Sequence, residues 1–452
     1  MPGETTALRG FGPGGAATAV LTEHSLRRGL AAEVHARPHE ELPTPVRVSH
    51  LALAHDAGEN AFAAERDSLL ALCDQFKIEP PPSSANFFAA NFGRFRLRWE
   101  RHTEFSTYTL FRFDPFESPF AEPAIGLVPA AWLANVPGQV LTAVHMAVER
   151  RWLGGDAHAS RFDCEAHLTP GGPLVGCGVS GGAGNAWTDF QIHGDGFGRV
   201  LLHNFSLTPG QTGRLVQRFL EIDTYRMMAL LALPLARETA PALTRIETGV
   251  AEVIAELART GDRDDRARLG RLSELAAEAE HLANATGYRF AAARAYYDII
   301  YRRIDALREV RLPGVQTVAE FMERRLSPAM LTCTSTAERQ EALSRRIARA
   351  GDLLRTRVDI EMEENNRDLL RSMDQRARIQ LRLQETVEGL SVVAISYYAL
   401  SLLGYAFKGA KAAALLPVTP EVAMAVALPV VVGIVMIGLR RLRRGHKSES
   451  GE

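Results

Sequence analysis

The chain has 452 residues, which is enough for two or three domains, and 23% of them are charged. Its formal net charge is −1, so no global positive field attracts nucleic acid, and we expect no nucleic-acid partner. A mean hydropathy of −0.07 excludes a chain that is apolar throughout and describes a water-soluble body with a small apolar portion.

The N-terminal part predicts a disordered tail followed by a mixed α/β domain. Residues 1–21 are rich in glycine and weakly apolar, which predicts disorder. Period-two alternation on both sides of a short polar turn predicts an antiparallel hairpin of 94–101 with 105–113. Similar patterns predict a helix at 59–76 and further strands at 46–53, 140–148, 174–179, 186–192 and 199–203. We therefore expect a largely antiparallel α/β head over residues 22–208.

From residue 209 the pattern becomes helical, and the fold class predicted for the whole chain is α+β. Apolar residues recur every three or four positions over 209–386, which predicts a long helical bundle or stalk with a kink or break near Pro234. Separate helices are expected at 268–284, 288–308 and 315–326. No proline interrupts the sequence between Pro328 and Pro417, so a long final helix is expected.

Two uncharged runs near the C-terminus predict a transmembrane hairpin. Each run is long enough for a helix that spans a hydrocarbon layer about 30 Å thick. The predicted first helix is 387–407, the external loop 408–421, the second helix 422–439 and the basic tail 440–452. The first expected partner is therefore the lipid bilayer.

Charge flanks and cysteine usage predict the orientation of this hairpin. Arginines precede the first run and follow the second, while the loop offers only Lys408 and Lys411 against Glu421. The positive-inside rule then places both termini in the cytoplasm. Four isolated cysteines are typical of a reducing compartment, and the N-terminus shows no secretory signal.

Gly176–Gly181 matches the dinucleotide pattern G-x-G-x-x-G, but the residues after it favour strand and turn. That pattern binds pyrophosphate only where a strand leads into a helix N-terminus. A glycine-rich hairpin is the better interpretation, and we expect no cofactor.

Two clusters of acidic residues with histidine are candidate polar sites. A strand would place Asp163, Glu165 and His167 on one face, and a second cluster consists of Asp189, His193 and Asp195. Metal binding or acid–base chemistry is one interpretation; a solvated strand face and an Asp-Gly turn is the other. The sequence leaves open whether the clusters meet.

His35 and Arg37, which precede a proline, form a further candidate pair for a site or for tying a loop to its domain. No local signature identifies a nucleophile, so we name no catalytic residue and no metal ligand set.

The first apolar run carries a stripe of small and hydroxyl-bearing residues at helical spacing: Ser391, Ala394, Tyr398, Ser401 and Tyr405. In lipid, such a stripe is expected to face protein, because small residues allow close approach and hydroxyls find partners there. The neighbour is either the second run or the same helix of another copy, and a pore lining is the alternative.

Four separated motifs, EVHARP, TDFQIHGDGF, EIDTYRMMALLALP and GLSVVAISYY, resemble an uncharacterised family of bacterial membrane-anchored proteins that is defined by a domain of unknown function. The resemblance covers nearly the whole chain beyond residue 20. It implies location in the bacterial inner membrane and no established activity.

The expected architecture is also similar to CorA-type magnesium channels, whose Gly-Met-Asn signature is replaced here by Tyr405-Ala406-Phe407-Lys408-Gly409. The first functional hypothesis is therefore an oligomeric scaffold that self-associates through the stalk and first membrane helix and binds a cytoplasmic protein. A CorA-like channel is the second, and an enzymatic head is the third.

Overall fold

The structure is a computed structural model, and it describes residues 7–11, 17–22, 24–35, 38–55, 59–83, 85–151, 164, 166–168, 172–259, 264–412 and 417–447. The chain divides into two units. The first comprises Met1–Thr260 with Gly270–Ala350, and the second comprises Gly261–Leu269 with Gly351–Glu452.

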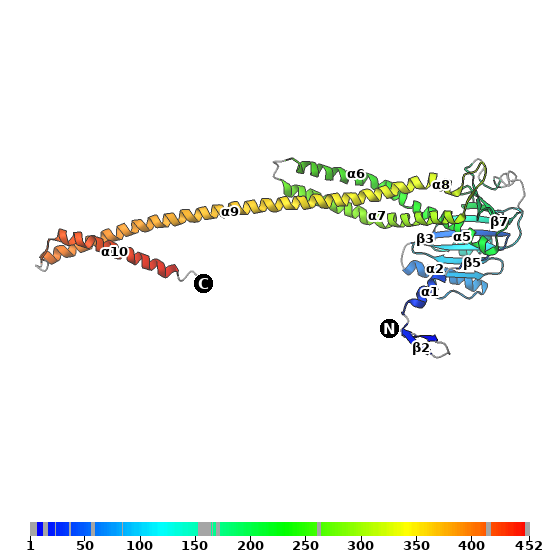
Figure 1. Ribbon diagram of the computed structural model, residues 1–452, viewed down its shortest axis with the longest axis horizontal. Helices are drawn as coiled ribbons and strands as arrows, with labels where there is room; N and C mark the ends of the chain where they lie inside the picture. The colour runs from blue at the N-terminus through cyan, green and yellow to red at the C-terminus, as the bar shows by residue number, and fades with distance from the viewer. Residues whose placement is uncertain are drawn as a thin grey trace. The chain divides into compact units, whose positions relative to one another are not determined.

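A mixed nine-stranded sheet forms the centre of the first unit, with the strand order β11-β8-β9-β10-β7-β3-β6-β5-β4 (Figure 1). All neighbouring pairs are antiparallel except β7 with β10. The strands are β3 (Val46–Ala54), β4 (Phe87–Asn91), β5 (Arg96–Arg101), β6 (Phe105–Arg112), β7 (Gln139–Arg150), β8 (Val175–Val179), β9 (Gly184–Thr188), β10 (Gly198–Asn204) and β11 (Val310–Arg311).

The predicted strands and the α+β class are confirmed, with one shortened strand. β5 and β6 form the predicted hairpin, and β8 and β9 form the glycine-rich hairpin expected around Gly176–Gly181. The prediction of a strand through residue 192 is wrong beyond Thr188, because Phe190 has a positive φ of 52° that leaves the extended conformation. The short strands β4 and β11 have no counterpart in the predictions.

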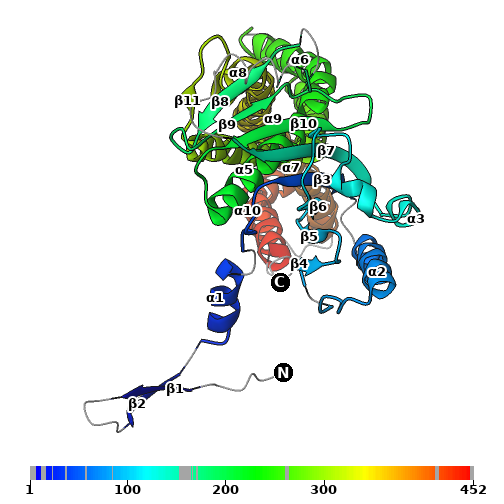
Figure 2. The same cartoon turned by 90° about the vertical axis from the view of Figure 1, so that its right-hand side faces the viewer.

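Helices cover both faces of the sheet. One face packs against α5 (Pro209–Leu230), and the core there includes Val48, Val144, Val216 and Phe219. The other face packs against α2 (Glu59–Phe76), which lies beside the β4–β6 end of the sheet (Figure 2). The 3₁₀ helix η1 (Ala124–Leu127) and α3 (Ala130–Leu133) complete this second layer.

A helical bundle follows the sheet in the first unit. It consists of α6 (Ala232–Leu257), α7 (Asp265–Leu307) and the first part of α9 (Ser327–Ala412), with α8 (Val318–Arg325) before α9. Ion pairs and hydrogen bonds join these helices: Arg245–Glu278, Arg339–Glu247 and Gln340–Thr286. α5 ends at Leu230, close to the break predicted near Pro234, whereas α7 is a single helix where two were predicted.

The second unit contains the apolar helix pair predicted from the sequence. The C-terminal part of α9 and α10 (Pro420–Lys447) are long and apolar enough to cross a membrane. They contact each other where Gly404 meets Met424, because a Cβ on Gly404 would lie 3.0 Å from the Met424 sulfur.

The N-terminal segment differs from the predicted disorder. β1 (Ala7–Phe11) and β2 (Ala17–Thr22) pair as an antiparallel two-stranded sheet, and α1 (Arg27–His35) follows them. Glycine content dominated our prediction, but short apolar segments on either side of a glycine-rich connection also satisfy the pattern of a hairpin.

Candidate functional site

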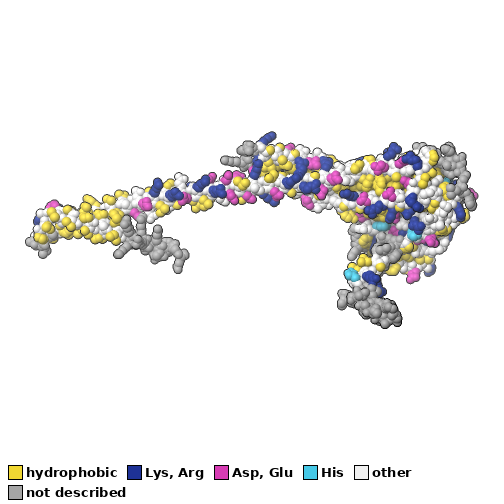
Figure 3. Space-filling model, viewed as in Figure 1, with side chains coloured by type: hydrophobic (Ala, Val, Ile, Leu, Met, Phe, Trp, Pro, Cys, Tyr) yellow, Lys and Arg dark blue, Asp and Glu magenta, His cyan; other side chains and the backbone are white. Residues whose placement is uncertain are grey.

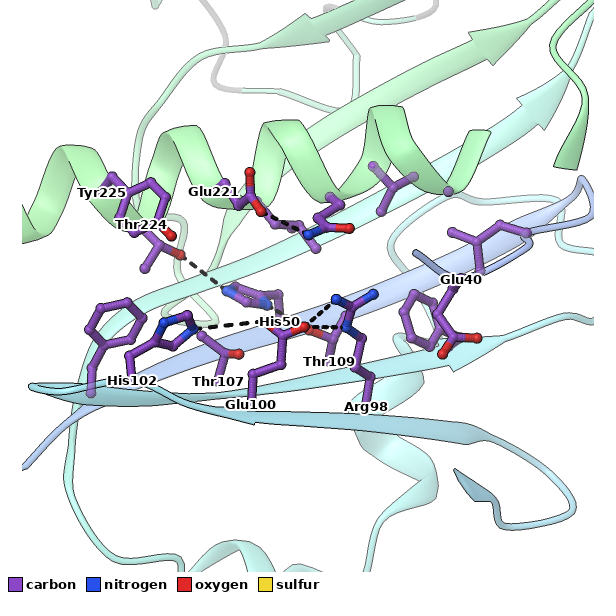
Figure 4. A pocket seen from close by; sticks show the side chains of 17 residues that line it. Glu40, His50, Arg98, Glu100, His102, Thr107, Thr109, Glu221, Thr224 and Tyr225 are labelled. Carbon is purple, nitrogen blue, oxygen red and sulfur yellow. Dashed lines mark hydrogen bonds and ion pairs between the residues drawn. The ribbon is translucent and has the colours of Figure 1, made fainter. Parts of the chain in front are cut away.

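A polar pocket lies between α5 and the sheet face formed by β3, β5 and β6 (Figure 4). Side chains alternate along a strand, so Leu97 and Trp99 enter the core under α2. Arg98 and Glu100, which alternate with them, point to the opposite face, which α5 covers. The sheet contributes polar side chains that share this face: His50, Arg98, Glu100, His102, Thr107 and Thr109. The opposite wall comes from α5, through Gln217, Glu221, Thr224 and Tyr225.

His50 at the centre of this pocket is held neutral. Its Nδ1 lies 2.8 Å from the Thr109 hydroxyl and its Nε2 lies 3.1 Å from the Thr224 hydroxyl, so both ring nitrogens are hydrogen-bonded. Burial lowers the pKa of His50 to about 4, and the nearby Asp223 charge only partly opposes this effect. His50 therefore joins β3, β6 and α5 through uncharged hydrogen bonds.

An ion-paired row occupies β5 beside His50. Arg98 donates from Nε to Glu100 Oε1 at 2.6 Å and from Nη1 to the Pro38 carbonyl at 3.0 Å. His102 Nε2 lies 3.7 Å from the other Glu100 oxygen, and its ring stacks on Phe105 at 4.4 Å. Burial raises the pKa of Glu100, but the interactions with His102 and Arg98 lower it by more, to about 2. Glu100 is thus ionised throughout the physiological range.

The segment before β3 closes one end of the pocket against α5. Leu42 N donates to the Pro209 carbonyl at 3.1 Å, and Glu40 forms an ion pair with Arg96 at 2.7 Å. A Cβ on Gly213 would lie only 1.7 Å from the Glu40 carbonyl oxygen, so no larger residue fits there. This close approach places Glu40 in the wall of the pocket.

The pocket is small and polar. The space that a water molecule can enter is about 50 Å³, which holds a few waters or one small polar group. Within the described ranges, no group of three or more His, Cys, Asp or Glu side chains is arranged to hold a metal ion. The arrangement is therefore suited to binding a small ligand through hydrogen bonds and ion pairs.

The predicted cluster at residues 189–195 forms a separate, internally bonded turn. His193 Nε2 lies 2.9 Å from Asp189 Oδ2, so these two residues do meet. Asp189 Oδ1 also accepts from Gln191 N at 3.1 Å, and Asp195 Oδ1 accepts from Phe197 N at 3.0 Å. None of the three lines the pocket under α5. Together with the ion pair between Asp195 and Arg199 of β10, these contacts hold the turn between β9 and β10.

The other predicted polar residues give little information. Asp163, Glu165 and Arg37 lie outside the described residues, and His35 is described only as the last residue of α1. Around Asp163, the described positions 164 and 166–168 are helix, turn and bend, so they do not form the strand that would have placed the three side chains on one face.

The sequence contained a signal for the pocket that we interpreted differently. In FRLRWERH, polar residues alternate with Leu97 and Trp99, and we interpreted this pattern only as one strand of an antiparallel hairpin. The structure covers the polar face with α5, which buries Arg98 and His50 to 6% and 4% exposure. Local periodicity predicts the face of a strand, but not what packs on it.

The stripe on the first apolar run points away from α10. Tyr398 and Tyr405 are 69% and 73% exposed, whereas the positions buried in this part of α9 are Ser396 and Gly404. Successive helical residues differ by about 100°, which places the stripe on the face roughly opposite these two residues. Of the two neighbours predicted for the stripe, α10 is therefore not the one that it contacts.

Together, these features define an α+β protein with a polar pocket beside α5 and a C-terminal pair of apolar helices. The chain belongs to the family described as Protein of unknown function (DUF3422), which matches residues 22–446. No curated protein and no solved structure matches the chain. The predicted membership of an uncharacterised family is confirmed.

Two of the buried histidines, His50 and His145, predict acid sensitivity of the first unit. The pKa values of His50 and His145 are about 4, against 6.5 for an exposed histidine. Between pH 6.5 and 4 the unfolded chain takes up these protons and the folded chain does not, so stability falls as the pH falls. The loss is on the order of 3 kcal/mol per histidine by pH 4.

Urea unfolding followed by tryptophan fluorescence measures this loss, because all four tryptophans lie between residues 99 and 187. His50→Asn should flatten the dependence of unfolding free energy on pH, and His281→Gln, at an exposed position, should leave it unchanged. An unchanged slope in His50→Asn contradicts the assignment of a buried neutral imidazole.

Gly213→Ala should destabilise the first unit by about 1–3 kcal/mol, because the new methyl group would collide with the backbone of Glu40. Gly210→Ala is the matched control in the same helix, since its Cβ would meet only ordinary contacts, with the Arg214 guanidinium at 3.6 Å and His39 Nε2 at 3.9 Å. Equal urea midpoints for the two variants would show that the segment before β3 does not pack as described.

Proposed function

We propose that this protein is anchored in the bacterial inner membrane by α9 and α10 and acts as a self-associating scaffold with a cytoplasmic binding body. The observation that carries the proposal is the exposure of the apolar helix pair. Only 11% and 6% of the apolar segments of α9 and α10 are buried. A core helix of a soluble protein would be mostly buried, and a signal sequence would lie near the N-terminus.

The distribution of side chains along α9 supports this anchor. Figure 3 shows apolar side chains gathered over the C-terminal part of α9, whereas charged side chains follow the helix before it. Exposed apolar residues in this region include Leu390, Tyr397, Leu402 and Tyr405. In water this surface would favour aggregation, and in hydrocarbon it is stable.

The charges beside the anchor support cytoplasmic termini. Arg371, Arg376, Arg378 and Arg382 precede the apolar part of α9, and arginines also follow the apolar part of α10. A basic flank at the outer ends of both helices favours retention of those ends in the cytoplasm.

The stripe supports self-association of the anchor. Because Ser391, Ala394, Tyr398, Ser401 and Tyr405 face away from α10, a second copy of α9 is the partner that gives their hydroxyls hydrogen bonds and lets helices approach closely. Copies in one membrane share the same orientation, so identical stripes lie at the same depth.

The hydroxyls of the stripe also favour the alternative function, an oligomeric channel that lacks the Gly-Met-Asn signature. A channel would place the same stripe around a water-filled path. Ion flux through proteoliposomes distinguishes a channel from a dry helix interface.

Cysteine labelling tests the proposed topology. Thr419→Cys, at an exposed position between the apolar helices, should react with a membrane-impermeant maleimide from the periplasmic side. Ser372→Cys, exposed on α9 before its apolar part, should react only after lysis. The four native cysteines are buried, so we expect little background labelling from them. The reverse labelling pattern would contradict the orientation, and labelling of both sites in intact cells would contradict the anchor.

Substitution in the stripe tests self-association. Ala394→Leu and Ser401→Leu should reduce the mass of the particle measured by sedimentation in mild detergent, because both enlarge the surface at the proposed contact. Val393→Leu is the matched control, since Val393 is exposed but lies off the stripe. A monomeric wild type, or equal masses for all variants, would count against a scaffold built on this stripe.

A further inference from the structure

The pocket under α5 has an excess of negative charge at its wall. Its lining contains three carboxylates, from Glu40, Glu100 and Glu221, but only one guanidinium, from Arg98. The arginines that pair with Glu40 and Glu221 are Arg96 and Arg303, and neither belongs to the lining. Two of the three carboxylates of the lining are therefore paired with arginines that are not part of it, and Glu221 also accepts a hydrogen bond from Gln217.

The single cation in the wall is already committed to other groups. Arg98 donates to Glu100 and to the Pro38 carbonyl, and its guanidinium lies 5.3 Å from the centre of the Phe87 ring. It therefore neutralises Glu100 in part without offering its hydrogen-bond donors to an anion in the pocket.

Thr107 provides an independent indication of a ligand. It lies on the pocket face of β6, is only 7% exposed, and lines the cavity beside Glu100 and His102 (Figure 4). Its neighbour on the same face, Thr109, bonds to His50, but no residue in the described part of the chain hydrogen-bonds to the Thr107 hydroxyl. The hydroxyl oxygen is open to the cavity and is not fully buried, so it can accept a hydrogen bond from a ligand.

Aromatic side chains, together with aliphatic ones such as Leu42 and Leu220, form the rest of the wall. Phe105, Phe111 and Tyr225 line the same cavity, and Tyr225 is fixed by stacking on Tyr296 at 5.5 Å. Aromatic faces attract organic cations, whereas they offer nothing to a metal ion that requires several oxygen or nitrogen ligands.

We propose that this pocket binds the primary ammonium group of a small organic cation. An ammonium has three donors and no acceptor, which matches carboxylates on both walls and an acceptor hydroxyl at Thr107. The available space of about 50 Å³ admits an ammonium with a short alkyl chain and excludes a nucleotide. This site is independent of the proposed membrane anchor, because all of its residues belong to the first unit.

The experiment uses the full-length protein in detergent and n-propylammonium as the probe, followed by saturation-transfer NMR. The ammonium should bind, and n-propanol and propionate, which have similar size without the positive charge, should not displace it. Thr107→Val should weaken binding about tenfold, since a hydrogen bond to a charged group is lost. Because the Thr107 hydroxyl has no partner in the described part of the chain, the urea midpoint of the Thr107→Val variant should not fall below that of the wild type.

Glu221→Gln should weaken binding to a similar extent, and Glu274→Gln, at an exposed position away from the pocket, is the matched control. Three results would each overturn the proposal. These are the absence of saturation transfer to n-propylammonium, binding of propanol or propionate equal to that of n-propylammonium, and unchanged binding of n-propylammonium to both the Thr107→Val and the Glu221→Gln variants. Membrane location and self-association are unaffected by any of these outcomes, so the two proposals fail separately.

Discussion

The arrangement of the first unit depends on burying ionisable side chains between α5 and the sheet. Removing a charge from water costs several kcal/mol unless a partner compensates for it. Arg98 with Glu100 and Glu40 with Arg96 satisfy this requirement as ion pairs, and His50 satisfies it by remaining neutral. α5 therefore packs where Thr224 reaches His50, and the hydrogen bond from Leu42 N to the Pro209 carbonyl ties its first turn to the segment that carries Glu40. Its register is fixed by polar contacts as well as by apolar packing.

α5 contributes both apolar residues to the core and polar residues to the pocket. Val216, Phe219 and Leu220 enter the core against the sheet, which supplies the apolar driving force. Glu221 and Thr224, which follow these residues along α5, lie in the pocket wall. Asp223 and Arg226 pair with each other on the opposite flank, where Arg226 lies over the Phe190 ring at 5.3 Å. The motif EIDTYRMM thus joins the pocket to the turn that carries Asp189 and His193.

The two sides of the pocket show how much of this arrangement the sequence predicts. Alternation predicted β5 and β6 and their pairing, because pleat and turn are local properties of the chain. The same alternation implies that Arg98, Glu100 and His102 share one face, but we did not identify that face as a site. Which element covers that face depends on contacts between residues more than a hundred positions apart, such as His50 with Thr224. Clusters of acidic residues with histidine were easier to notice in the sequence, but Asp189 and His193 mainly stabilise their own turn.

In the second unit, the direction in which a residue points around its helix determines whether it contacts lipid or protein. Leu390, Val393, Ile395 and Leu402 are all exposed, and at about 100° per residue they point in different directions around α9. A single protein partner would cover one stripe and leave the rest in water, whereas lipid covers every direction except the one that faces α10. Within that apolar surface, the stripe is the one direction in which small and hydroxyl-bearing residues replace large aliphatic ones. Lipid gains little from such residues, but a second helix gains close packing and hydrogen bonds. We therefore propose a bilayer around the pair and another copy along the stripe, because this arrangement satisfies both kinds of surface.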